Sequence, residues 1–174
     1  GEAEETFPEF LSQMRTRASA TDIPGLLSRY RDCDTVPDTR PTTADLDALP
    51  VPDYAEYLER ARALGVTIAP DTCVLPLETS RGCWWATKSK CVFCAAEEGT
   101  VCHRKKSSAR ILRELAQLSR TCELPVFHLM DNNPPMSHLH DLFPAIHGEA
   151  LDYTFMCEAK STLNRQQIHS LFRG

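Results

Sequence analysis

Three cysteines close together are the residues of this chain best suited to chemistry. Cys83, Cys91 and Cys94 form a Cys-x7-Cys-x2-Cys segment. Thiolates select zinc, copper(I) or iron–sulfur clusters. Structural zinc commonly takes four ligands as two short-spaced pairs, whereas this segment has one pair and a single cysteine before it. Three thiolates suit an iron–sulfur cubane in which one iron stays open to an external ligand.

Zinc is an alternative interpretation of the same cysteines. Cys102 or His103 follows the segment and would complete a four-ligand set. The chain would then be a zinc-stabilised binding module without catalysis. We expect the remaining four cysteines to be ordinary core or loop thiols; they are Cys33, Cys73, Cys122 and Cys157.

The composition is that of a soluble globular protein. The chain has 174 residues, of which 42% are hydrophobic and 25% are charged, close to the usual proportions. The net charge of −5 argues against a nucleic-acid partner, because nucleic-acid-binding domains carry an excess of basic residues. The basic run from Arg104 to Lys106 is short, and we expect it to lie in a solvated loop.

Cysteine usage indicates a reducing compartment. Eight cysteines would suggest disulfides in a small secreted protein. This sequence, however, opens with no signal-peptide pattern and has no apolar run long enough to cross a bilayer. We therefore expect a cytoplasmic protein without a membrane partner. Because it begins with Gly1 and ends at Gly174 directly after a helix-like pattern, we also expect a fragment of a longer protein.

The first part of the chain predicts two helices separated by a proline-rich stretch. Apolar residues recur at helical spacing over 7–14 and over 54–64, and Gly65 ends the second pattern. Residues 23–52 are rich in Pro, Thr and Asp, a composition typical of turns and extended connectors.

From residue 73 onward, short apolar runs alternate with helical patterns. The runs predict strands at 73–79, 124–130 and 151–158. A helix capped by Ser107 or Ser108 follows the first strand, and an apolar stripe over 139–146 follows the second. Asn164 with Gln167 predicts a capping box for a last helix. This order implies a parallel sheet or barrel, with functional side chains at the carboxyl ends of the strands.

Polar residues follow the second and third predicted strands. Asp131 and Asn132 come directly after 124–130, although turn chemistry alone also favours them there. Glu158 and Lys160 end the third strand, where a polar ligand or a mutual salt bridge would satisfy their charges. We expect His128 to be a core histidine. His138, His140 and His147 are expected on the surface of a helix.

The cysteine segment resembles a known loop. Residues 78–94, which read ETSRGCWWATKSKCVFC, resemble the cluster loop of radical S-adenosylmethionine (SAM) enzymes that mature ribosomally made peptides. The subgroup is the one with an N-terminal cobalamin-binding domain. Weaker similarities extend over nearly the whole chain; they are 22–26, 45–54, 106–107, 131–132, 158–160 and 163–167. After Cys94, residues 95–102 and, within the loop, Ala86 depart from the family's usual pattern.

The resemblance implies a cofactor set and a reaction. The three cysteines would hold a [4Fe-4S] cluster whose open iron binds S-adenosylmethionine. Phe93 would lie near the adenine, and the polar residues after the strands would contact the cofactor; they are Asp131, Asn132, Glu158 and Lys160. The family cleaves S-adenosylmethionine reductively to a 5′-deoxyadenosyl radical. The parent protein would be a cobalamin-dependent C-methyltransferase of a precursor peptide, supplied with electrons by a flavodoxin or ferredoxin.

The resemblance also implies a fold. We expect a partial (β/α) barrel of the radical SAM type, truncated after about three βα units. Residues 1–22 would be the end of a cobalamin-binding domain, 23–70 a connector with one helix, and 71–174 the first half of the barrel. Half a barrel leaves strand edges unpaired, so we expect the isolated fragment to be marginally stable and inactive.

Overall fold

The computed structural model describes residues 2–16, 23–26, 42–89, 91–94, 102–149 and 151–173. The chain forms two compact units, Gly1–Ala44 and Asp45–Gly174. No helix among the described residues is both long enough and apolar enough to cross a membrane. Cys33 and the departures from the family pattern at 95–101 lie outside the described residues.

The first unit contains the predicted N-terminal helix. Helix α1 (Thr6–Thr16) carries the apolar stripe, and the rings of Phe7 and Phe10 stack 6.4 Å apart. None of the helix residues is buried. The hydroxyl of Thr6 donates a hydrogen bond to the carbonyl of Pro24.

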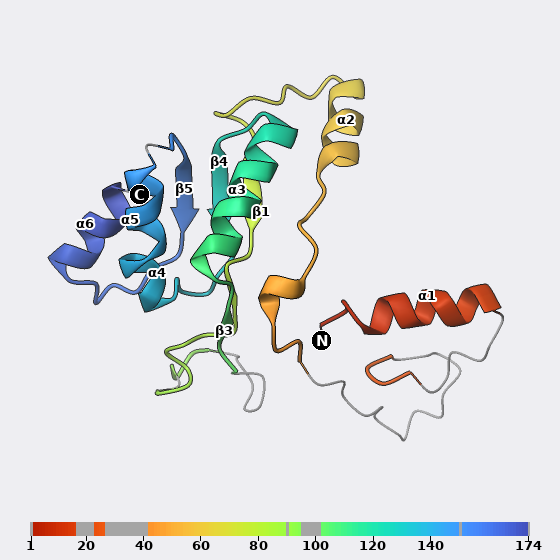
Figure 1. The fold of residues 1–174 in the computed structure, drawn as a ribbon, viewed down its shortest axis with the longest axis horizontal. Coiled ribbons are helices and arrows are strands. Elements are labelled where there is room, and N and C mark those ends of the chain that lie inside the picture. Colours follow the sequence, from red (N-terminus) through yellow and green to blue (C-terminus); the bar gives the residue numbers. More distant parts are fainter. Residues whose placement is uncertain are drawn as a thin grey trace. The chain divides into compact units, whose positions relative to one another are not determined.

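The second unit is a mixed α/β structure (Figure 1). Its parallel sheet has the order β1-β4-β5, as the alternating pattern predicted. The strands are β1 (Leu75–Leu77), β4 (Val126–Leu129) and β5 (Thr154–Cys157); the helices are η2 (Leu46–Ala48), α2 (Ala55–Ala63), α3 (Ser108–Cys122), α4 (Met136–His140), α5 (Leu142–Gly148) and α6 (Arg165–Arg173). A small antiparallel ladder joins β2 (Ser80–Arg81) to β3 (Arg104–Lys105).

The strands are shorter than the apolar runs predicted. Turns at their amino ends explain this, because the backbone N–H of Cys73 donates to Ala69 and that of Leu151 donates to Ile146. A residue whose N–H is taken by a turn cannot also join the ladder. The sheet therefore begins only at Leu75 and Thr154 in these two strands.

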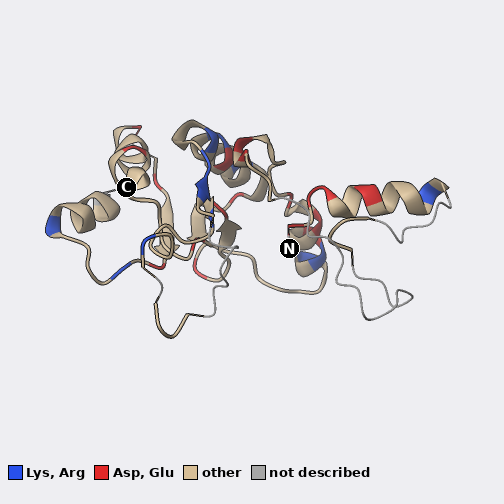
Figure 2. Cartoon of the chain, turned by 90° about the horizontal axis from the view of Figure 1, so that it is seen from below, with Lys and Arg blue, Asp and Glu red and all other residues tan. Residues whose placement is uncertain are grey.

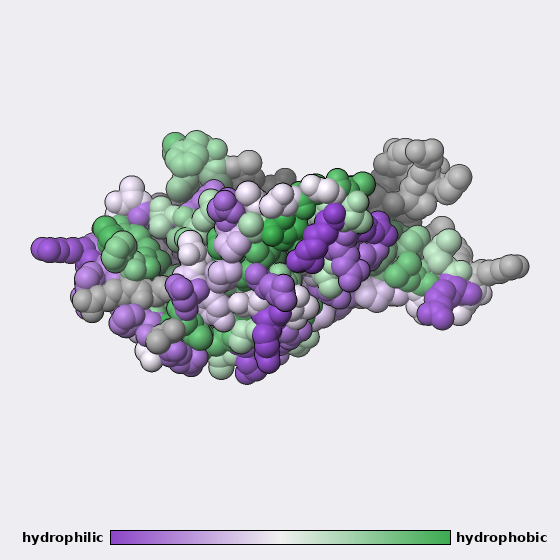
Figure 3. Space-filling view, turned by 90° about the horizontal axis from the view of Figure 1, so that it is seen from above, coloured by the Kyte–Doolittle hydropathy of each residue, from purple (hydrophilic) through white to green (hydrophobic). Residues whose placement is uncertain are grey.

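The two faces of the sheet differ in burial. Leu75, Phe127 and Phe155 lie in register across the strands, on the face that packs against α3 and α5 in one apolar core. The neighbouring row on the opposite face of the sheet consists of Pro76, His128 and Met156, and 52% of Met156 is exposed. His128, expected in the core, is only half-buried on this open face. Figure 3 shows the molecule from above, with hydrophilic and hydrophobic side chains intermixed on that face.

Local chemistry sets the helix boundaries. The hydroxyl of Ser107 accepts a hydrogen bond from the N–H of Arg110 and caps α3. Asn164 and Gln167 accept hydrogen bonds from each other's backbone N–H, which confirms the predicted capping box of α6. The stripe predicted over 139–146 forms two helices instead of one, because Pro144 has no N–H to donate and its ring clashes with the carbonyl four residues earlier.

The second half of the predicted connector belongs to the α/β unit. Leu46 and Leu58 are buried, and Arg110 donates to the carbonyls of Asp47 and Leu49. The carboxylate of Asp47 accepts a hydrogen bond from the backbone N–H of Ser107. A hydrogen bond with the Ser107 side chain holds the pKa of Asp47 below its usual range, although burial acts in the opposite direction. The compact unit therefore starts at Asp45 and includes the second half of the predicted connector, because apolar residues between the prolines dock onto the core.

The candidate cysteine-loop site

A two-stranded ladder closes the base of the loop that carries the cysteines. Ser80 pairs with Lys105 and Arg81 with Arg104, directly after β1 ends. The N–H of Lys106 donates to the carbonyl of Thr79 over 2.8 Å and extends this closure. Residues 82–103, hereafter the cysteine loop, are therefore an excursion held at its neck at the carboxyl end of β1. Figure 2 looks at this end of the sheet and shows β3 as a basic strand leading into α3.

Gly82 makes the neck possible. Its φ is +79°, and a Cβ there would lie 2.7 Å from the carbonyl oxygen of Cys102. Gly65 has the same φ with nothing within 4 Å of its Cβ position. Both positions favour glycine conformationally, at a cost of about 1–2 kcal/mol for another residue, but only Gly82 adds a backbone clash.

Gly82→Ala should therefore destabilise the α/β unit more than Gly65→Ala does. We expect a loss of about 1–2 kcal/mol for Gly65→Ala from the left-handed backbone alone, and a larger loss for Gly82→Ala. Urea unfolding of both variants measures the difference, which isolates the close approach between the two sides of the neck. Equal losses would show that the neck can open without cost.

Asp131 joins the ends of β1 and β4. Its Oδ1 accepts hydrogen bonds from the backbone N–H groups of Thr79 (3.1 Å) and Ser80 (2.5 Å) and from the Ser80 hydroxyl (3.0 Å). Its Oδ2 accepts from the Thr79 hydroxyl. Asp131 is 3% exposed, so its carboxylate is engaged with the start of the cysteine loop. These hydrogen bonds position the start of the cysteine loop relative to the end of β4.

His138 belongs to the same buried network. Its Nδ1 lies 3.3 Å from the Thr79 hydroxyl and its Nε2 lies 3.3 Å from the carbonyl of Lys106. The residue is 2% exposed, so the prediction that it lies on the surface was wrong. One side of α4 packs against the neck, and helical periodicity alone did not identify that side. Burial lowers the pKa of His138, while its hydrogen bond to Lys106 and the charge of Asp131 oppose the shift.

The stability of the unit should fall as the pH drops below about 6.5, the ordinary histidine value. The pKa of His138 is lowered in the folded chain. Below about pH 6.5 the unfolded chain therefore binds a proton at this residue that the folded chain does not bind, and the free energy of unfolding decreases. Urea unfolding at pH 7.5 and pH 5.5 should show the loss, and His138→Gln should reduce it. His140→Gln, on the exposed side of the same helix, is the matched control. A pH dependence unchanged in His138→Gln would contradict this assignment.

The basic run is not a solvated loop throughout, which corrects our prediction. Lys106 is 3% exposed, and its Nζ donates to both carboxylate oxygens of Glu114, over 2.9 and 2.8 Å. Glu114 is fully buried and also accepts from Nε of Arg110 over 2.6 Å. The signal was present in the sequence, because Glu114 falls on the apolar stripe of α3 between Ile111 and Leu115.

The three predicted ligands lie on one loop but are not gathered around one point. Cys83 and Cys91 are half-buried, and Cys94 is exposed. The N–H of Cys94 donates to the carbonyl of Cys91 over 3.0 Å, so these two share one turn. In the part of the chain that the structure describes, no three His, Cys, Asp or Glu side chains come together as a metal site. The donor chemistry fits a soft metal, and the loop would have to close around it.

The tryptophans of the loop contact the segments that follow β4 and β5. Nε1 of Trp84 donates to the carbonyl of Pro134 over 3.2 Å. The ammonium of Lys160 lies over the ring of Trp85, 2.8 Å from its centroid. The structure thus brings Lys160 to the cysteine loop without the salt bridge to Glu158 that we considered. Phe93 is 89% exposed, and Asn132 and Glu158 are exposed.

The other candidate ligands lie where the loop returns to the neck. Cys102 is exposed. Nε2 of His103 is buried without a hydrogen-bond partner among the described residues, and burial lowers the pKa of this imidazole. Cys122 is buried and Cys157 half-buried, and burial raises the pKa of both thiols. These two are packed thiols, as predicted.

Comparisons with known proteins assign neither a family nor a function to this chain. No family model, no curated protein and no solved structure matches this chain.

Proposed function

We propose that the chain is part of a radical SAM enzyme, with Cys83, Cys91 and Cys94 as ligands of a [4Fe-4S] cluster. One observation carries the proposal: the loop with the three cysteines leaves the carboxyl end of the first of three parallel strands. Functional groups of parallel α/β folds gather at this end. The segments after β4 and β5 contact the same loop through Trp84 and Lys160.

The proposed fold of the parent is a (β/α) barrel of which this unit is the first part. Helices cover the face of the sheet that contains Leu75 and Phe127, whereas the row with Pro76 and Met156 is open. In such a barrel the helix-free face lines the interior. The open face would then be part of a cavity above which the cysteine loop sits.

The residues would divide the work as follows. The three thiolates would hold the cluster, and exposed Phe93, Asn132 and Glu158 are available to contact S-adenosylmethionine. Asp131 would fix the start of the loop. When bound, the cluster and S-adenosylmethionine supply radical chemistry, and in the cobalamin-dependent parent that chemistry would serve C-methylation of a precursor peptide. A flavodoxin or ferredoxin would supply the electrons.

Anaerobic reconstitution with iron and sulfide tests the cluster. We expect a brown chain with about four irons, whose visible absorbance bleaches on reduction. Cys91→Ala should lose this cluster. Cys73→Ala is the matched control, because Cys73 is also a half-buried free thiol but lies before β1.

Two results would contradict the proposal. A colourless chain that holds one tight zinc would favour the alternative, a zinc-stabilised module completed by Cys102 or His103. Retention of the iron–sulfur cluster in Cys91→Ala would show that the ligands are misassigned. For the parent, production of 5′-deoxyadenosine from S-adenosylmethionine is the direct assay of the reaction class.

A further inference from the structure

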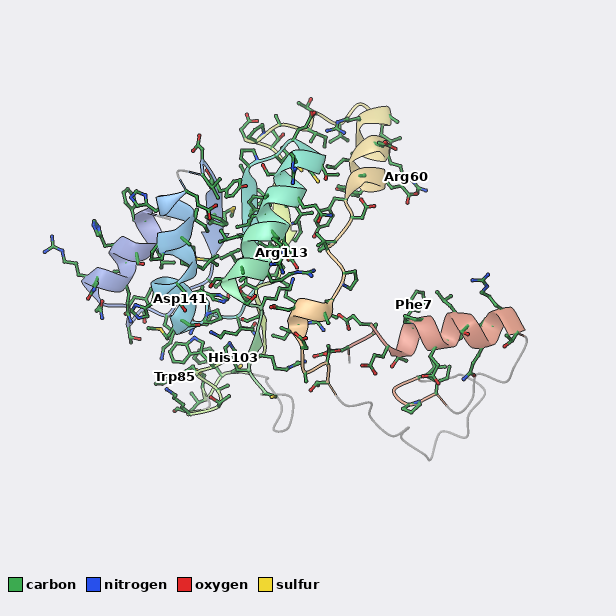
Figure 4. The ribbon with its side chains drawn as sticks, viewed as in Figure 1. Phe7, Arg60, Trp85, His103, Arg113 and Asp141 are labelled. Atoms are coloured by element: carbon green, nitrogen blue, oxygen red, sulfur yellow. The ribbon has the colours of Figure 1, made fainter. Side chains whose placement is uncertain are left out.

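A hollow of about 430 Å³ opens between the cysteine loop and the segments around α4 and α6. Its walls are mainly apolar and include Trp84, Trp85, Met136 and Leu163. Lys160 supplies its cation. Figure 4 shows Trp85 on the cysteine loop, beneath α4. Three separate segments of the chain therefore build the hollow, and each contributes an apolar side chain.

Lys160 is the unusual group of this hollow. It is half-buried, and its ammonium lies 2.8 Å from the ring centroid of Trp85 and 5.6 Å from that of Trp84. It makes no salt bridge with any described residue. An indole face attracts a cation by about 0.5–2 kcal/mol, but it neutralises no charge. An anion would therefore gain a charge-assisted hydrogen bond that no described residue supplies.

We propose that this hollow binds a carboxylate carried on an apolar body, namely an acidic residue next to a large apolar residue of the substrate peptide. The carboxylate would accept a hydrogen bond from Lys160, and the apolar side chain would lie against Trp84, Met136 and Leu163. This inference rests on the proposed function for the identity of the ligand as a peptide. S-adenosylmethionine fits the hollow less well, because its sulfonium and ammonium groups give it a net positive charge that Lys160 opposes.

Fluorescence tests the proposal directly, because the chain has only two tryptophans and both line the hollow. Three probes share one apolar body and differ in charge: N-acetyl-Phe-Asp-amide, N-acetyl-Phe-Asn-amide and N-acetyl-Phe-Lys-amide. Titrated into the metal-free chain, the Asp peptide should bind about tenfold more tightly than the Asn peptide, as expected for one charge-assisted hydrogen bond. The Lys peptide should bind most weakly.

Variants of two lysines locate the charge. Lys160→Met should bring the affinity for the Asp peptide down to that for the Asn peptide, and Lys160→Arg should keep the difference. Lys88→Met is the matched control, because Lys88 lies 5.7 Å from the Trp84 ring but lines a different hollow. It should leave all three affinities unchanged.

Equal affinities for the three peptides would overturn the proposal. So would displacement of the Asp peptide by S-adenosylmethionine at similar concentrations, because the hollow would then belong to the cofactor. The titrations need no cluster. A chain that ranks the peptides by charge but takes up no iron would disprove the proposed function and leave the carboxylate site standing.

Discussion

Glu114→Ala should lower the free energy of unfolding of the α/β unit by about 3–5 kcal/mol, the usual cost of removing one partner from a buried ion pair. Glu114 is fully buried and accepts hydrogen bonds from Lys106 and Arg110. Its loss leaves the ammonium of Lys106, which is 3% exposed, without its acceptor. Arg110 keeps the carbonyls of Asp47 and Leu49, so most of the penalty falls on Lys106. Urea unfolding followed by circular dichroism measures the change.

Two controls separate the unpaired charge from other effects of the substitution. Glu114→Leu combined with Lys106→Met removes both charges and should recover most of the lost stability, because an apolar pair of similar volume often replaces a buried ion pair without cost. Glu56→Ala removes a salt bridge to Arg60 whose side chains are 77% and 76% exposed, and such a change is worth about 0–1 kcal/mol. A Glu114→Ala variant no less stable than Glu56→Ala would show that water reaches Lys106.

The sequence predicted the elements well because each has a local cause. The apolar runs of β4 and β5, the Ser107 cap of α3 and the reciprocal cap of Asn164 and Gln167 each depend on residues that are close together in the sequence. Boundaries were less accurate where a tertiary contact decides them. The docking of Leu46 onto the core, for example, moved the start of the α/β unit into the predicted connector.

The buried polar network was not predictable in the same way. Thr79 lies 52 residues before Asp131 and 59 residues before His138 in the sequence. Each of these three residues is by itself a common turn or surface residue. Only the parallel pairing of β1 with β4 brings Asp131 beside Thr79. Sequence spacing identified the three cysteines as one segment, but it carried no information on whether the free chain holds their thiols together.

Asp131→Ala should be nearly as damaging as the loss of Glu114, by a different mechanism. Without the carboxylate, the N–H groups of Thr79 and Ser80 lose their acceptor in a region where these residues are 0% and 4% exposed. Each buried donor left unsatisfied costs about 1–3 kcal/mol, so we expect a total loss of about 3 kcal/mol or more in urea unfolding. Asn132→Ala, at the exposed neighbouring position, should change stability by less than about 0.5 kcal/mol.

Asp131→Asn distinguishes the two oxygens. The amide oxygen can still accept from Thr79 and Ser80 in place of Oδ1, while its NH₂ group faces the Thr79 hydroxyl in place of Oδ2. That hydroxyl can turn away from Asp131 and donate to Nδ1 of His138, which lies 3.3 Å away. We therefore expect a loss of only about 1 kcal/mol, the worth of one ordinary hydrogen bond. If Asp131 sets the position of the cysteine loop, the iron retained after reconstitution should decrease in the same order as stability: highest in the unchanged chain, lower in Asp131→Asn and lowest in Asp131→Ala. Full iron retention in a destabilised but folded Asp131→Ala chain would restrict the role of this residue to stability.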